Sequence, residues 1–292
     1  IPFSKKGIKD HCILTSSEEA DYFYMGQINN DRGCLQAARP NDYSYFKGNE
    51  DKHICDLEGE PGFEAANRYP IPEWLHNSII TTPGPIRKYS NIKYLFTRPN
   101  APVLMMDIIR NRKEEFDFPE KNSFGICAYI NHKIRALTVY ALHKSEFDKE
   151  LHIKRKWQAM SKVGSKAQQE YIDIMLNNSI SLCPRGSGVS SVRLYESCYY
   201  NRVPVMISDY DNILFAEDTH DLSFCYRICK KDMGPEYLHA ELEKIYNTPN
   251  EELKQKANSA KKFFETVVRD YFEDPTLYFM KWLEKKKNSF II

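Results

Sequence analysis

Residues Ser179–Asp209 have the sequence "SISLCPRGSGVSSVRLYESCYYNRVPVMISD", from which the fold class can be inferred. The apolar run Ser179–Pro184 predicts a buried strand, and the Pro-Arg-Gly and Gly/Ser residues after it predict a turn. Apolar residues at helical spacing in "VRLYESCYYN" then predict a helix, and "VPVMISD", which ends at Asp209, predicts a second strand. Two strands joined by a helix in this way are expected to lie parallel in one sheet.

The same alternation is present upstream of this stretch. "SFGICAYI" at Ser123–Ile130 is a short apolar run that fits a buried parallel strand, and "NHKIRALTVYALHK" after it predicts a helix capped by Asn131. A further helix is expected from about Ser165 to Asn177. The pattern predicts a parallel sheet covered by helices, and ligands of such sheets bind at the carboxyl ends of the strands.

The turn inside the opening stretch has the composition of an anion site. Glycines let a ligand approach the backbone closely, serines add hydroxyl donors, and arginine forks match phosphate oxygens. Glu196 follows Arg193 by three residues, so it is expected on the same helix face, where a carboxylate could accept hydrogen bonds from a ribose diol. The alternative for Arg193 and Glu196 is an ion pair on a solvated helix face.

The first hundred residues predict short strands separated by long polar loops. The clearest strand candidates are "ADYFYMG" (Ala20–Gly26) and "KYLFTR" (Lys93–Arg98), and "HICDLEGE" (His53–Glu60) is a strand-like run. The charged segment Ile109–Lys121 indicates a domain boundary. Downstream, a long helical stretch begins at Thr248-Pro249, and a terminal helix follows Asp274-Pro275.

Size and charge narrow the class of protein. A chain of 292 residues accommodates two domains. With 41 basic and 40 acidic residues the net charge is +1, which gives no overall electrostatic field to attract nucleic acid or an anionic membrane. No apolar stretch of the sequence approaches the length of a membrane span. The eight cysteines form no CxxC pair with metal-ligand spacing, so no zinc site is expected.

The stretch "LCPRGSGVSSVRLYESCYYNRVPVMISD" resembles the nucleotide-sugar motif of exostosin-like glycosyltransferases, and "SSEEADYFYMG" resembles an early segment of the same family. The resemblance covers most of the chain. It implies a GT-B architecture of the α/β class, in which two Rossmann-like domains face a cleft and a C-terminal helix returns to the first domain. The N-terminal, acceptor-side domain would comprise residues 1–118 with the terminal helix 275–292, and the nucleotide-sugar domain residues 119–274.

The resemblance also assigns roles to residues. The donor would be a UDP-sugar carrying xylose, glucuronate, galactose or N-acetylglucosamine, and the acceptor a glycan hydroxyl. Glu196 would hold the ribose, and Arg135 would reach the diphosphate from the side opposite the turn. The transfer would invert the anomeric centre without a metal ion or other cofactor. Arg193 and the turn at Gly186–Ser191 would hold the diphosphate. The residues expected to bind the nucleotide sugar also include Arg185, Gly186, Ser187, Gly188, Ser190 and Ser191.

An inverting transfer needs a general base within hydrogen-bond reach of the acceptor hydroxyl. The best stretch is "HICDLEGE", in which a strand breaks into acids, with Glu58 preferred over Asp56 and Glu60. Further acidic and histidine candidates are Asp107, Glu73 and His11, while Asp209 could either cap a turn or touch the sugar.

Two alternatives stay open at this stage. A GDP-fucose-dependent fucosyltransferase shares the architecture and also places Arg and Glu in the second domain. A non-catalytic, glycan-binding relative would keep the fold without transferring a sugar. Cysteines within apolar runs and the near absence of glycosylation sequons favour the cytoplasm, as for a microbial or viral enzyme, over the Golgi lumen.

Overall fold

The computed structural model describes residues 18–29, 45–58, 72–82, 94–97, 103–111, 114–154, 164–186, 191–209 and 221–288. The chain divides into two units, Ile1–Asn100 with Asp274–Ile292, and Ala101–Glu273. The boundary expected after residue 118 stays a prediction. The helix α4 (Val103–Asn111), which precedes that boundary, belongs to the second unit.

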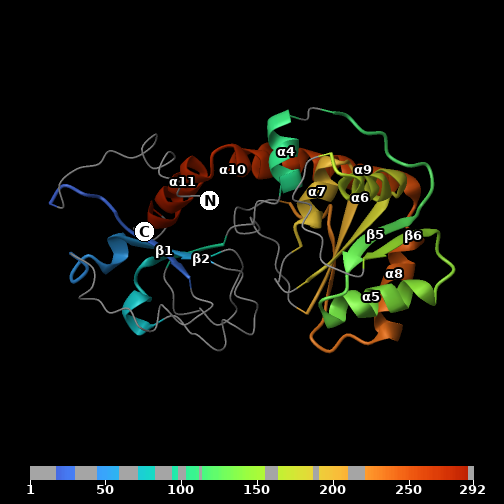
Figure 1. Cartoon of the computed structure of the whole chain (residues 1–292), viewed down its shortest axis with the longest axis horizontal. Coiled ribbons are helices and arrows are strands. Elements are labelled where there is room, and N and C mark those ends of the chain that lie inside the picture. The colour runs from blue at the N-terminus through green and yellow to red at the C-terminus, as the bar shows by residue number, and fades with distance from the viewer. Residues whose placement is uncertain are drawn as a thin grey trace. The chain divides into compact units, whose positions relative to one another are not determined.

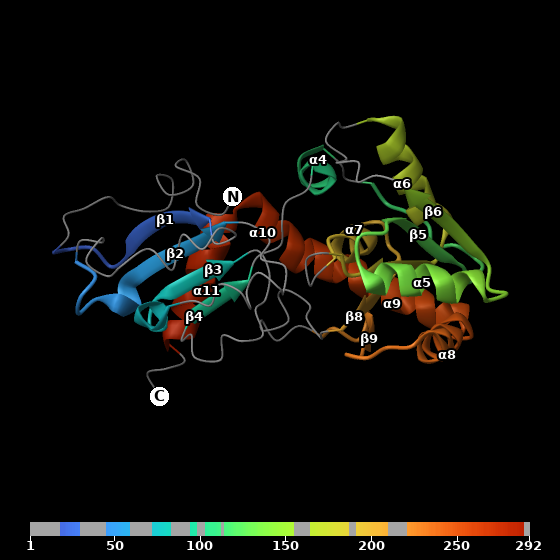
Figure 2. The same cartoon turned by 60° about the horizontal axis from the view of Figure 1, so that its bottom comes forward.

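The first unit contains a four-stranded sheet in which every neighbouring pair is parallel. The strands are adjacent in chain order, as Figure 2 shows, and the C-terminal helix α11 (Pro275–Asn288) belongs to the same unit. Lys287 Nζ of α11 lies 4.5 Å from the centre of the Tyr22 ring, just before the first strand. The strands are β1 (Phe23–Asn29), β2 (His53–Glu58), β3 (Ile79–Thr82) and β4 (Tyr94–Thr97), with short 3-10 turns at Glu50–Lys52 and Glu73–Leu75.

The second unit contains a five-stranded parallel sheet with the order β6-β5-β7-β8-β9. Figure 1 shows α6, α7 and α9 above this sheet and α5 and α8 below it. Two parallel sheets confirm the α/β class, while the expected arrangement of the two domains across a cleft stays a prediction. The elements are β5 (Phe124–Tyr129), α5 (Lys133–His143), β6 (Lys149–Lys154), α6 (Lys166–Asn177), β7 (Ile180–Pro184), α7 (Arg193–Tyr199), β8 (Val203–Ser208), β9 (Tyr226–Cys229), α8 (Pro235–Tyr246), α9 (Asn250–Phe263), a π turn (Phe264–Val268) and α10 (Arg269–Glu273).

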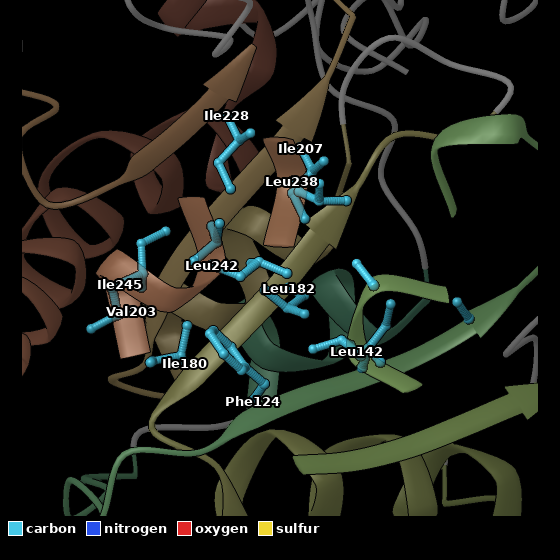
Figure 3. Close-up of a cluster of buried hydrophobic side chains, with 14 of the residues drawn as sticks. Phe124, Leu142, Ile180, Leu182, Val203, Ile207, Ile228, Leu238, Leu242 and Ile245 are labelled. Atoms are coloured by element: carbon cyan, nitrogen blue, oxygen red, sulfur yellow. The ribbon is translucent and has the colours of Figure 1, made fainter. Parts of the chain in front are cut away.

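Alternate residues of the central strands face the two helical layers. Phe124 of β5, Ile180 of β7 and Val203 of β8 belong to the apolar cluster that also contains Leu142 of α5 and Leu242 of α8, as Figure 3 shows. All five side chains are completely buried. Because strand residues alternate between faces, the same strands can bury a second set of side chains under α6 and α7.

On that second face, a glycine allows the helix to come close. A Cβ atom at Gly125 of β5 would lie 2.9 Å from the carbonyl oxygen of Ile174 in α6 and 3.0 Å from Cβ of Asn178. A larger residue would therefore push α6 away from the sheet.

The end of α6 is held by a buried arginine. Arg202 is 2% exposed, and its Nε and Nη2 donate to Met175 O at 2.8 Å and to Leu176 O at 2.7 Å. Its Nη1 donates to Asp117 O at 2.9 Å and also contacts the carbonyls of Tyr200 and Asn201. Burial lowers the pKa of Arg202 to about 10, so the guanidinium is still charged at neutral pH. One cation thus satisfies the last carbonyls of a helix and the segment that leads into β5.

Some elements differ from the sequence-based expectation. The elements without a named counterpart in the sequence analysis include β3, α4, β6 and α8. The helix after β5 is capped by His132 and not by Asn131, since His132 Nδ1 accepts a hydrogen bond from Ile134 N at 3.2 Å. Within the described residues six cysteines are free thiols, and no helix there is long and apolar enough to cross a membrane.

Candidate functional site

The second sheet changes direction between β5 and β7. The chain goes from β5 to β6 on one side and from β7 to β8 on the other, which makes the carboxyl ends of β5 and β7 the switch point of this sheet. Pairing between these strands is limited to Phe124 with Ile180 and Gly125 with Ser181. Both strands continue beyond the paired residues, to Tyr129 and Pro184 respectively. The strands therefore part toward the edge at which open parallel sheets bind ligands.

Arg135, on the first turns of α5, spans the switch point. Its Nη1 donates to Tyr129 O, the last residue of β5, at 3.0 Å, and its Nε lies 3.5 Å from Pro184 O, the last residue of β7. A Cβ atom at Gly186 would lie 2.7 Å from Nη2 of this guanidinium and 3.0 Å from Cζ. Position 186 therefore has room for the arginine only because it is a glycine.

A buried ion pair ties the turn after β7 to the end of β8. Arg185 is 4% exposed, and its Nη1 lies 2.6 Å from Oδ1 of Asp209. Its Nε donates to Gly186 O at 3.2 Å, and its backbone N donates to Ile207 O at 2.9 Å. Asp209, for which a turn cap and a sugar contact were both open, therefore places its carboxylate on Arg185. Because Arg185 directly precedes Gly186, this ion pair fixes the position of the backbone at Gly186.

His132 lies at the same edge, between β5 and α5, and is a site residue that the sequence did not identify. Because Nδ1 accepts the Ile134 N–H, the neutral ring carries its proton on Nε2. Partial burial and the charge of Arg185 lower the pKa of His132, although Asp209 acts in the opposite direction. The ring is thus a neutral hydrogen-bond donor near the guanidinium groups of Arg185 and Arg135. The sequence points to Asn131 as the cap of this helix, because Asn is the stronger helix-capping residue, and so it does not identify His132.

Arg193 and Glu196, one turn apart on α7, both contact Tyr171 of α6. Arg193 Nε donates to Tyr171 Oη at 3.1 Å, and Tyr171 Oη donates to Glu196 Oε2. Glu196 is 2% exposed, so it does not lie on a solvated helix face. Burial raises the pKa of Glu196, against the hydrogen bond from Tyr171 and the charge of Arg193. The ribose contact expected of Glu196 is untested, and in this structure the carboxylate is turned into the protein.

The structure describes only part of the remaining candidate set. Asp56 and Glu58 lie on β2, with Glu58 as its last residue, and the structure describes their backbone alone. Ser191 precedes α7, and its carbonyl accepts from Leu194 N at 3.1 Å. Glu73 is exposed in a 3-10 turn, whereas Asp107 of α4 is 7% exposed and accepts from Asn111 Nδ2 at 2.9 Å. The candidates outside the described residues are His11, Glu60, Ser187, Gly188 and Ser190.

The switch point therefore combines positive charge with neutral donors. Arg135, Arg185 and Arg193 lie on the elements that meet there. The carboxylate of Asp209 is paired with Arg185, and that of Glu196 is linked to Arg193 through Tyr171. The partly buried guanidinium of Arg135, together with the His132 ring, can bind an anion at this edge of the sheet. In the described part of the chain, no cluster of three or more His, Cys, Asp or Glu side chains could hold a metal ion.

One family model matches more than half of the chain. The model of the RXYLT1 C-terminal domain family matches residues 117–271, which lie within the second unit. None of the curated proteins matches the chain.

Solved structures resemble the chain at low identity. TarM is 10% identical with a TM-score of 0.38, and the match covers 83% of this chain and 57% of TarM. MurG of Acinetobacter baumannii is 13% identical with a TM-score of 0.36, over 77% of this chain and 72% of MurG. A variant of S. aureus TarM in complex with fondaparinux, α-GlcNAc-glycerol and UDP gives 10% identity and a TM-score of 0.39 over 83% and 57%. The chain thus spans 57% of the length of TarM, and TM-scores below 0.5 support no inference about its function.

Proposed function

Because the chain belongs to the RXYLT1 C-terminal domain family, an exostosin-like glycosyltransferase family, we propose that it transfers a sugar from a nucleoside-diphosphate sugar to a glycan hydroxyl. The family match lies over the second unit, which has the five-stranded parallel sheet. Open parallel sheets of this kind bind nucleotides at their switch point. The diphosphate of the donor is therefore assigned to the carboxyl ends of β5 and β7.

The observation that carries the proposal is the position of Arg135. Its guanidinium lies between the ends of β5 and β7 and against the Cα atom of Gly186, with its side chain only partly buried. A planar fork at this place can hold two oxygens of a diphosphate. As the sugar leaves, negative charge develops on the diphosphate, and a fixed cation stabilises that charge most in the transition state.

The donor and the course of the reaction follow from the resemblance. We propose a UDP-sugar, carrying xylose, glucuronate, galactose or N-acetylglucosamine, and an inverting transfer in which guanidinium groups neutralise the leaving group. GDP-fucose is the alternative donor. The acceptor hydroxyl is assigned to the first unit, where the general base would lie at the end of β2.

Binding of nucleotides tests the proposal directly. Calorimetric titration is expected to show that UDP binds at least about tenfold more tightly than UMP, because the second phosphate adds charge-assisted hydrogen bonds to guanidinium groups. The affinity is expected to be the same with and without EDTA. Preference for GDP would move the assignment to a fucosyltransferase. Binding of glycan but of neither nucleotide would indicate a non-catalytic relative.

Glu58, at the end of β2, is the proposed general base. Glu58→Gln is expected to lower the rate of sugar transfer by at least about 100-fold, because general-base catalysis contributes about 10²- to 10⁴-fold. Affinity for UDP should not change, since the base acts on the acceptor. Transfer assays on Asp56→Asn and Glu58→Gln, with UDP titrations as the control, distinguish the candidates. Normal turnover of the Glu58 variant would reassign the base to Asp56 or Glu60.

A further inference from the structure

The guanidinium of Arg193 occupies the place where β5 and β7 part. Its Nη2 donates to Cys127 O of β5, and its Nη1 lies 3.4 Å from Leu182 O of β7. These carbonyls come just after the last paired residues, Gly125 and Ser181. Strand carbonyls that lose their ladder partners need other donors when they are covered by a helical layer. Arg193 supplies those donors from α7, in place of the missing ladder.

Two residues hold this guanidinium in position. Tyr171 Oη accepts from Arg193 Nε at 3.1 Å, and the Tyr171 ring lies under the guanidinium, with Cζ 4.8 Å from the ring centre. The same hydroxyl donates to Glu196, so Tyr171 has a single orientation for its proton. Tyr171 and Glu196 are 4% and 2% exposed. The chain of contacts runs from α6 through α7 to both strands.

We propose that Arg193, Tyr171 and Glu196 form a wedge that holds the carboxyl ends of β5 and β7 apart and so positions Arg135 and Gly186 for the diphosphate. The three are positioning residues and not ligands of the donor. This inference rests on the proposed function for the identity of the ligand. It differs from the sequence-based expectation, which placed Arg193 on the diphosphate and Glu196 on the ribose.

The contacts of Arg193 support a positioning role. Each of its three guanidinium nitrogens donates to a protein oxygen, namely Tyr171 Oη, Leu182 O and Cys127 O. Arg135, in contrast, contacts the last carbonyl of each of the same strands, Tyr129 O of β5 and Pro184 O of β7. A change in the spacing of the strands at the wedge would therefore change the two anchor points of Arg135. Sites of this kind need supporting residues behind the groups that touch the ligand.

Tyr171→Phe removes the hydroxyl that joins Arg193 to Glu196 and keeps the ring under the guanidinium. The matched control is Tyr140→Phe, because Tyr140 of α5 is 51% exposed. Hydrogen exchange without nucleotide is expected to be faster in peptides that cover residues 126–130 and 182–186 of the Tyr171 variant only. Unchanged exchange at both strand ends would overturn the wedge, whatever the protein binds.

Nucleotide binding then separates positioning from general loss of stability. Tyr171→Phe is expected to weaken UDP binding by about tenfold, the size of one hydrogen bond to a charged group. In an Arg135→Ala background the same change should have little further effect, because its influence passes through Arg135. Equal weakening in both backgrounds would overturn the positioning role. If the wild-type chain binds no nucleoside diphosphate, the proposed function fails, and with it the role of the wedge in binding the nucleotide sugar. The hydrogen-exchange experiment would still show whether Arg193 holds the strand ends apart.

Discussion

Arg135→Ala is expected to weaken binding of UDP by about 10- to 100-fold, because charge-assisted hydrogen bonds contribute about 1.5–3 kcal/mol and each 1.4 kcal/mol changes the affinity tenfold. UMP should lose less, because it has a single phosphate. Uridine should bind as it does to the wild type. Isothermal titration with the three ligands measures the effect, and the thermal unfolding midpoint shows whether the fold is intact. Arg110→Ala, at an exposed arginine of α4, is the matched control.

Gly186→Ala gives an independent test of the same contact. Its Cβ atom would lie 2.7 Å from Nη2 of Arg135, so the flexible end of the arginine must move. The variant should bind UDP as weakly as Arg135→Ala, and combining the two changes should add little. Wild-type affinity in Gly186→Ala, or an equal loss for UDP and uridine in Arg135→Ala, would contradict the assignment of the diphosphate.

Arg202→Ala is expected to give the largest loss of stability, about 3–5 kcal/mol, because it leaves buried carbonyl groups without their donor. Those carbonyls include Met175 O and Leu176 O at the end of α6, whose partial negative charge the guanidinium also balances. The midpoint of thermal unfolding should fall by roughly 10 °C, at about 2–4 °C per kcal/mol for a unit of this size.

Differential scanning calorimetry of Arg202→Ala beside Arg227→Ala measures this loss. Arg227 of β9 has an exposed side chain, so its removal should shift the midpoint little. A midpoint within about 2 °C of the wild type for the Arg202 variant would show that water replaces the guanidinium at the end of α6.

The central strands of the second unit are predictable because their burial is uniform. Every residue of β7 and of β8 is buried, and the sequence of each is a short apolar run between turn residues. The edge strand β6 lacks this signal, since only Leu151 and Ile153 are apolar and its residues are mostly half-buried. Among the described strands it pairs with β5, and this tertiary pairing makes "KELHIK" a strand. The start of α8 has a clear local signal that the sequence analysis did not use: Gly234 at the N-cap is followed by Pro235 at the first helical position.

The sequence indicates where the candidate site lies in the sheet, but it does not indicate the side-chain contacts found there. The alternation of strands and helices predicts a switch point in this sheet, and the glycines and arginines after residue 184 predict an anion site beside it. The contacts of Arg193 and Glu196 depend on Tyr171, which comes from another helix and is recognisable only as one apolar position among many. The contact between Arg135 and Gly186 likewise joins two turns that are distant in the sequence.

The buried cysteine thiols can report local unfolding of the sheets that surround them. Burial raises the pKa of Cys183 to about 11 and raises those of Cys127 and Cys198 as well, so their reactive thiolate forms are scarce while the fold is closed. Cys55, in the first unit, has no exposed surface. An alkylating reagent can therefore modify these positions only when the surrounding sheet opens. Mass spectrometry of the labelled peptides would follow the opening of each unit separately, at Cys55 for the first and at Cys183 for the second.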